Sequence, residues 1–235
     1  MIIDFHSHVL PGVDDGSSSV EESIEMLHME KQQGIQHVVA TPHFYAHHDT
    51  PERFLARRDR AEQKLRSAME RYADMPTLSV GAEVYYFQGI SDCDALFDLT
   101  IDRLGCILLE MPDSPWGESM FTEIDHIRSK QGILPIIAHI DRYIGPFRDY
   151  GIPKRLESLS VLVQANANFF IRKSTSAMAL RMLRQGRIHI LGSDCHNTST
   201  RKPNLMDALA VINTKLGNSA IEEICMKQDE IMKRR

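Results

Sequence analysis

The sequence predicts an α/β fold in which helices cover a parallel sheet. Short runs of apolar and β-branched residues alternate along the chain with longer stretches of helical periodicity. The short runs contain few polar residues, which is typical of parallel strands buried on both faces. Repeated strand-then-helix units are compatible with either a doubly wound sheet or a barrel.

The first expected elements carry clear boundary signals. A strand over Ile2–Phe5 is followed by Ser19-Val20-Glu21-Glu22, which resembles a capping box at the start of a helix. That helix is expected to run to about Gln33, because Gly34 stands where a C-terminal glycine is favoured. A strand over His37–Thr41 follows, and Pro51 marks the first turn of a charged helix that extends to about Tyr72.

The remaining elements continue the alternation. Further strands are expected over Thr77–Ala82, Cys106–Leu109, Leu134–Ala138, Val161–Gln164 and Ile188–Gly192. Further helices are expected near Met120–Gln131, Ser174–Gln185, Asn204–Leu216 and Ala220–Met232.

Composition indicates an ordinary globular protein. Hydrophobic residues make up 43% of the 235 residues and charged residues 25%. No linker or low-complexity segment divides the chain, so one domain over Met1–Arg235 is expected. The net charge of −5 disfavours nucleic-acid binding, which needs a basic surface.

The cysteines and the N-terminal residues indicate a location in the cytoplasm. The four cysteines are scattered without a C-x-x-C pair, which suits a reduced compartment. The first residues show no signal-peptide pattern, and no apolar run approaches the ~18 residues of a membrane span. We therefore expect a cytoplasmic protein that does not insert into a membrane.

Residues that commonly bind metals follow the expected strands. His6 and His8 form H-x-H at the first strand, with Asp14 and Asp15 close behind. Five later segments place similar residues at strand ends: His43 in A-T-P-H, Glu83 in V-G-A-E, Glu110 in I-L-L-E, His139 in I-I-A-H, and Asp194 with His196 in L-G-S-D-C-H. His47 and His48 lie on the loop after His43 and are candidates for the rim of such a site.

The arrangement of these residues favours a metal cluster. In a β/α barrel the carboxyl ends of all strands meet at one face. Residues two apart on a strand also point the same way, so H-x-H and D-x-H can each present two ligands. A lone histidine after a strand is ordinarily a hydrogen-bonded residue, but buried carboxylates and imidazoles in such number need a cation. Without thiolates, the donors suit Mn, Fe or Zn.

A second motif in the same region suggests different chemistry. Cys195 and Arg201 have the C-x5-R spacing of cysteine-dependent phosphatases. Such enzymes present the thiolate from a loop whose backbone N–H groups surround the phosphate, and this loop lacks glycine. Strand alternation also directs Cys195 away from its neighbours Asp194 and His196, so the sequence disfavours a thiol mechanism.

The motifs together resemble those of the PHP (polymerase and histidinol phosphatase) superfamily. The resemblance rests on H-S-H-V-L-P-G-V-D-D-G, A-T-P-H, G-A-E, L-L-E, I-A-H-I-D-R and S-D-C-H-N, in this order from Ile2 to about Leu216. It is closest to the manganese-dependent bacterial protein-tyrosine phosphatases of capsule and exopolysaccharide operons. The segments Phe44–Asp49 and Asp113–Met120 depart from that pattern.

The resemblance implies a fold and a site. The fold would be a distorted (β/α)7 TIM-like barrel holding three divalent cations, expected to be Mn2+. Arg142 and Arg201 stand where the family binds phosphate. The three ligand sets would be His6, His8, Glu83 and Asp194 for the first cation; Glu83, Glu110 and His139 for the second; and Asp15, His43 and His196 for the third.

The implied substrate is phosphotyrosine on a cognate tyrosine autokinase that controls polysaccharide export. Two alternatives stay open. One is a PHP phosphatase of a small metabolite such as histidinol phosphate, which would share the metals and differ in its pocket. The other is a non-catalytic metal-binding or docking module, which the complete ligand set disfavours.

Overall fold

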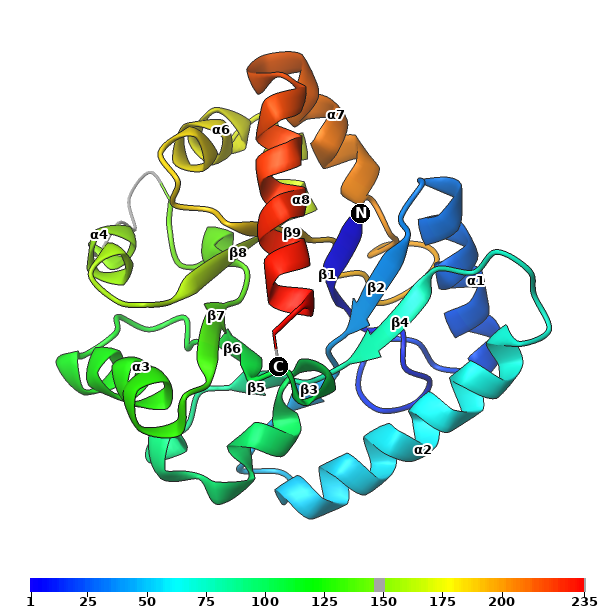
Figure 1. Ribbon diagram of the computed structural model, residues 1–235, viewed down its shortest axis with the longest axis horizontal. Coiled ribbons are helices and arrows are strands. Elements are labelled where there is room, and N and C mark those ends of the chain that lie inside the picture. Colours follow the sequence, from blue (N-terminus) through cyan, green and yellow to red (C-terminus); the bar gives the residue numbers. More distant parts are fainter. Residues whose placement is uncertain (146–150, 235) are drawn as a thin grey trace.

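Parallel strands form the centre of the protein and helices surround them (Figure 1). The computed structural model describes residues 1–145 and 151–234. The strands are β1 (Ile3–Ser7), β2 (His37–Ala40), β3 (His43–Phe44), β4 (Thr77–Val80), β5 (Glu83–Tyr85), β6 (Cys106–Glu110), β7 (Leu134–Ile137), β8 (Leu162–Asn166) and β9 (Ile190–Gly192).

Two of the expected strands are each followed, after a break of two residues, by a further short strand. The chain leaves β2 at Ala40 and resumes as β3 at His43, and it leaves β4 at Val80 and resumes as β5 at Glu83. Pro42 has no N–H for the ladder, and a Cβ on Gly81 would lie 3.0 Å from the Cα of Ile101. The expectation that His43 and Glu83 end their strands is therefore wrong, because each begins a new short strand beyond a break.

The strand pairings follow a curled sheet. One set has the order β1-β2-β4 and the other β3-β5-β6-β7-β8-β9, with every ladder parallel. β1 and the end of β9 meet through the isolated parallel bridge Ser7–Cys195. The backbone N–H of Asp194 donates to the carbonyl of His6 at 2.8 Å across this seam. The predicted α/β class with a parallel sheet is confirmed.

The helices occupy the expected positions to within three residues, and two short ones are additional. The expected helices are α1 (Val20–Gln32), α2 (Pro51–Met69), α3 (Glu118–Gln131), α6 (Ser176–Arg184), α7 (Leu205–Leu216) and α8 (Asn218–Met232). The additional ones are α4 (Ile152–Glu157) and α5 (Ala167–Ile171), which are too short for a periodic pattern. Between β5 and β6 the chain forms 3-10 turns over Ile90–Asp92, Asp94–Leu99 and Ile101–Arg103.

The first helix shows how local sequence sets an element. The Ser19 hydroxyl accepts a hydrogen bond from the backbone N–H of Glu22 at 3.2 Å, as the capping motif predicts. The Glu22 carboxylate does not return to Ser19 and instead accepts from the Ser18 N–H at 2.9 Å. Gly34, with φ of +80°, then turns the chain towards β2.

Two apolar clusters lie on opposite faces of the curled sheet. Alternate strand residues such as Leu108 and Ile136 form an inner cluster, while their neighbours Leu109 and Ile137 pack towards the helices. Ile231 near the end of α8 belongs to the inner cluster, so this helix covers the amino-terminal end of the strands (Figure 1). Among the described residues, no helix combines the length and the apolar character that a membrane crossing requires.

Candidate metal centre

The nine predicted ligand residues meet at the carboxyl ends of the strands, in neighbouring groups. The first group joins β1 with the segments after β4 and β9. Nε2 of His6 lies 3.1 Å from Nε2 of His8 and 3.2 Å from Oε2 of Glu83. Oδ1 of Asp194 lies 3.6 Å and 3.5 Å from the same two histidine nitrogens. Four donor atoms therefore face one small volume.

The second group shares Glu83 with the first. Its Oε1 lies 2.7 Å from Nε2 of His139, and that nitrogen lies 3.5 Å from Oε1 of Glu110. A carboxylate placed between two groups in this way can bridge two cations.

The third group lies towards the surface. Oδ1 of Asp15 is 3.6 Å from Nε2 of His43 and 3.5 Å from Nε2 of His196. Nδ1 of His43 also lies 3.0 Å from Oε2 of Glu83 and 3.7 Å from Oε2 of Glu110. The His43 ring thus lies between the second and third groups, whereas the sequence resemblance implies the third alone.

The residues present fit bound cations. Within the described chain, buried Oε2 atoms of Glu83 and Glu110, Nδ1 of His43 and Nε2 of His196 make no hydrogen bond. A buried polar atom without a partner costs roughly 1–3 kcal/mol, and more when it is charged. Unpaired nitrogen and oxygen atoms that face one another are the arrangement that a divalent cation would satisfy.

The pKa values of two ligand carboxyl groups, those of Glu83 and Asp194, also favour cation binding. Burial alone would raise the pKa of Glu83, but His6, His139 and His43 outweigh it and hold that pKa well below its ordinary value. Burial likewise acts against the charged form of Asp194, and the neighbouring His6 and His8 lower its pKa well below the usual range. Both carboxylates are therefore ionised and able to bind a metal.

Polar residues outside the nine orient them. Nδ1 of His8 donates to Oδ2 of Asp14 at 2.7 Å, which leaves Nε2 facing the cluster. Gln164 and Asn166 on β8 form a second support. Oε1 of Gln164 accepts the backbone N–H of His139, and the Asn166 amide donates to Oδ2 of Asp194 at 2.9 Å. Gln164 and Asn166 were not predicted from the sequence, although alternating polar residues in a buried strand are a usable signal.

Two candidate ligands have unusual backbone geometry. His139 has φ of +30° and Asp194 φ of +56°, a region that residues other than glycine rarely adopt. Such conformations persist only where the surroundings over-determine them, and they concentrate at functional sites. Here they turn the chain directly after β7 and β9.

The two predicted phosphate-binding arginines border the cluster. Arg142 donates to Oε1 of Glu110 at 2.8 Å and to Oδ2 of Asp194 at 2.9 Å. Arg201 donates to Oδ1 of Asp194 at 2.8 Å. Both side chains are partly exposed, and both line a cavity of 350 Å³ beside the cluster. They can therefore meet an anion that approaches from this side.

Cys195 points away from the cluster, and the prediction from strand alternation is confirmed. Its thiol is fully buried and lies 3.8 Å from Oε1 of Glu30, next to Asp4. Burial, followed by the charges of Glu30 and Asp4, raises the pKa of this thiol well above its ordinary value. A protonated thiol that faces two acids is not a nucleophile for phosphate.

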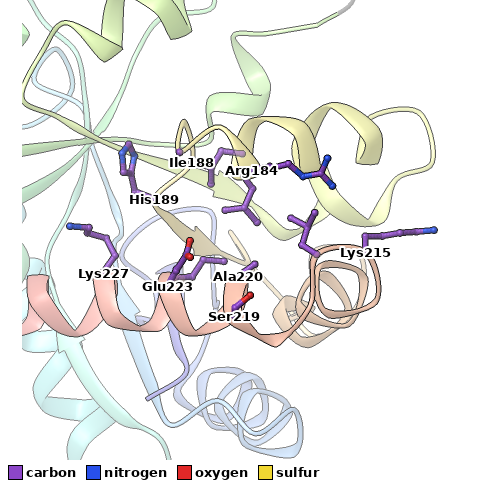
Figure 2. A pocket seen from close by; sticks show the side chains of 12 residues that line it. Arg184, Ile188, His189, Lys215, Ser219, Ala220, Glu223 and Lys227 are labelled. Carbon is purple, nitrogen blue, oxygen red and sulfur yellow. The ribbon is translucent and has the colours of Figure 1, made fainter.

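A larger cavity lies elsewhere. It measures 500 Å³ and is bordered by α6, α7 and α8, with Arg184, Lys215 and Lys227 at its edge (Figure 2). Ile188 and His189, which also line it, directly precede β9 and so lie at the amino-terminal end of the strands. None of the nine predicted ligands borders this cavity.

Comparisons with known proteins find relatives that match nearly the whole chain. A family model described as "Capsular polysaccharide synthesis, CpsB/CapC" matches residues 2–233. The chain is 29% identical over 238 residues to the tyrosine-protein phosphatase CpsB of Streptococcus pneumoniae, covering 95% of this chain and 94% of the relative. It is 27% identical to the tyrosine-protein phosphatase YwqE of Bacillus subtilis (strain 168), covering 92% of this chain and 86% of that protein.

The fold has a solved counterpart. A crystal structure from the pair YwqE of Bacillus subtilis and CpsB of Streptococcus pneumoniae, described as unique metal-dependent tyrosine phosphatases, superimposes with a TM-score of 0.85. The match covers 99% of this chain and 94% of that one at 23% identity. At this identity the likeness establishes the shared fold.

Proposed function

The chain belongs to the capsular polysaccharide synthesis CpsB/CapC family, and from this membership we propose that it is a metal-dependent protein-tyrosine phosphatase. One observation carries the proposal. Nitrogen and oxygen donors from six separate segments converge at one end of the sheet, and two arginines border them. Relatives that match nearly the whole chain are named tyrosine-protein phosphatases.

The donor set would hold three divalent cations, which we propose to be Mn2+; Fe or Zn would suit the same atoms. His6, His8, Glu83 and Asp194 would hold one, and Glu83, Glu110 and His139 a second. Asp15, His43 and His196 would hold the third, with His43 placed to contact the second as well. When bound, the cations would lower the pKa of water to roughly 7 and so supply the nucleophile.

The protein's own residues would position the substrate. The guanidinium groups of Arg142 and Arg201 donate hydrogen bonds to the carboxylates of Glu110 and Asp194. When substrate binds, they would donate to the phosphate oxygens instead, and the planar arrangement of their N–H groups suits such paired contacts. Four ligand carboxylates leave two surplus positive charges on three divalent cations, and this surplus attracts a phosphate dianion. A phenolate, with a pKa of about 10, leaves more readily than an alkoxide.

The physiological substrate in this proposal is a phosphotyrosine-containing protein, namely a cognate tyrosine autokinase of capsular or exopolysaccharide synthesis. The family's description supports the capsular setting. A cytoplasmic location agrees with the scattered cysteines, which form no disulfide among the described residues.

The proposal is tested by metal analysis combined with two assays. Purified protein is expected to contain divalent metal, to lose phosphotyrosyl-peptide hydrolysis on chelation, and to regain it with Mn2+. Asp194→Asn should lower kcat by about 100-fold or more, because Asp194 would hold a cation and accepts hydrogen bonds from both Arg142 and Arg201. Turnover of histidinol phosphate that equals or exceeds turnover of the peptide would indicate that the physiological substrate is a small metabolite and not a protein. Full activity without metal would refute the metal chemistry.

A further inference from the structure

A second cavity borders the metal cluster at its third ligand group. It measures 440 Å³ and includes Asp15 and His43 of the third ligand group. Tyr45, His48 and Phe54 also line it. Tyr45 and His48 lie in the segment 44–49, where the sequence departs from the family pattern. The sequence predicted only His47 and His48 as rim candidates in this segment, and His48 does line the cavity.

Aromatic rings form the wall of this cavity. The Tyr45 ring stacks on His43 with centroids 5.1 Å apart and planes at 30°. The Tyr85 ring lies behind this lining with its centroid 5.6 Å from that of Tyr45 and its plane tilted by 47°. The His48 ring makes an edge contact with Tyr45 at a centroid distance of 6.1 Å. Tyr45 is only partly buried, so part of its ring surface faces the cavity next to a candidate ligand.

Contacts with α2 hold the loop that carries Tyr45 in place. Phe44 and Phe54 are buried and pack with ring centroids 5.2 Å apart. Arg57 pairs with Asp49 and donates to the carbonyl of Val13 at 3.3 Å. An aromatic wall anchored to α2 in this way is ordered before a ligand arrives, which reduces the entropy lost on binding.

The two cavities beside the cluster differ in chemistry. The cavity of Arg142 and Arg201 is lined mainly by polar and charged residues, among them Arg172, Asn166 and Thr175. The Tyr45 cavity adds aromatic and aliphatic surface to its acidic residues. A phosphate ester with an aromatic group therefore has a polar side for its anion and an aromatic side for its ring.

We propose that the Tyr45 cavity is an aryl subsite, in which Tyr45 packs against the phenyl ring of the substrate while the cluster and the arginines hold the phosphoryl group. The inference rests on the proposed phosphatase function and adds the residue that favours aryl over alkyl esters. A pair of aromatic rings in contact corresponds to about a threefold to tenfold gain in affinity.

Calorimetric titration of the Mn2+-loaded protein with phenylphosphonate and methylphosphonate tests the subsite. Both ligands carry the same anion, and only the first carries a ring. The wild-type protein should bind phenylphosphonate about threefold to tenfold more tightly. Tyr45→Ala should bring this ratio close to one, and Tyr45→Phe should retain it. If the alanine variant does not fold, Tyr45→Leu fills the space without a ring.

Tyr72→Ala is the matched control, because Tyr72 is 44% exposed and its ring contacts His28. Manganese content is measured for every variant. An unchanged ratio in Tyr45→Ala would overturn the aryl subsite and leave the phosphatase proposal intact. Loss of manganese or equal weakening of both ligands would show that Tyr45 only supports His43, which also overturns it. A wild-type protein that binds neither phosphonate would overturn both proposals.

Discussion

At the scale of single residues, backbone alternation separates side chains of opposite function. Asp194 and His196 face the cluster, and Cys195 between them faces Asp4 and Glu30. The C-x5-R spacing of Cys195 and Arg201 is therefore coincidental as a phosphatase motif. Arg201 still reaches the site, through its hydrogen bond to Asp194.

Cys195→Ser is expected to leave kcat/KM for a phosphotyrosyl peptide within about twofold of the wild-type value. The thiol is fully buried on the far side of the strand end and contacts no predicted ligand side chain. A serine hydroxyl fits the space and can donate to Glu30. A loss of activity of 100-fold or more with manganese content unchanged would instead indicate thiol chemistry.

At the scale of elements, the site depends on two strand breaks and one close seam. The breaks at Pro42 and Gly81 place His43 and Glu83 at the start of new strands, with paired register His43–Glu83. At the seam, β9 approaches β1 so closely that a Cβ on Gly192 would lie 2.4 Å from Cβ of His6. Only glycine allows this approach.

Gly192→Ala should therefore weaken both stability and metal binding. The added methyl group forces β9 away from β1, and overpacking of this kind costs roughly 1–3 kcal/mol. Because Asp194 lies only two residues after Gly192, the distance between Asp194 and His6 should grow and manganese affinity should fall at least about tenfold. Thermal unfolding and manganese titration measure the two effects.

Gly117→Ala is the matched control for that substitution. Gly117 has φ of −79°, and a Cβ there would meet only the Ser119 hydroxyl at 3.8 Å. Its manganese affinity should match that of the wild-type protein, and its unfolding temperature should fall less than that of Gly192→Ala, because the only expected cost is a weaker N-cap of α3. Equal behaviour of the two variants would contradict the role assigned to the seam.

At the scale of the whole molecule, the cluster couples stability to pH when no metal is bound. Burial would lower the pKa of His139, but Glu110 and Glu83 outweigh it and raise the pKa to about 9. His8 behaves alike: burial is outweighed by Asp14, Asp194 and Glu83, and its pKa rises well above the ordinary value. A histidine with a raised pKa stabilises the fold below its unfolded value of about 6.5 and loses that contribution at higher pH.

The unfolding temperature of chelator-treated protein should accordingly fall as the pH rises from 6.5 to 9, by of the order of 5 °C. Saturating Mn2+ should abolish the fall, because the cations replace the protons and bind more tightly when the ligands are deprotonated. Differential scanning calorimetry with and without chelator measures both curves. A metal-free protein whose stability rises over this range would contradict the assigned charges.

Sequence and structure contribute different parts of the site. The sequence shows H-x-H, D-x-H, Glu110 and His139 at or directly after strand ends, and His43 and Glu83 close behind two further strands. These residues are readable because strand ends meet at one face and their residue types select cations. Gln164, Asn166 and the aromatic wall around Tyr45 were not predicted, because their roles depend on which segments become neighbours. Short helices such as α4 and α5 were missed because five or six residues carry no measurable period.

The sequence by itself determined the α/β class and the order of the long elements, and it predicted the nine candidate ligands, since periodicity and residue type are local properties. The tertiary structure decided the interrupted strands, the seam at Gly192, the burial of Cys195 and the position of His43 between two groups. These features arise from contacts between segments far apart in the chain. Such contacts exist only after the sheet has curled.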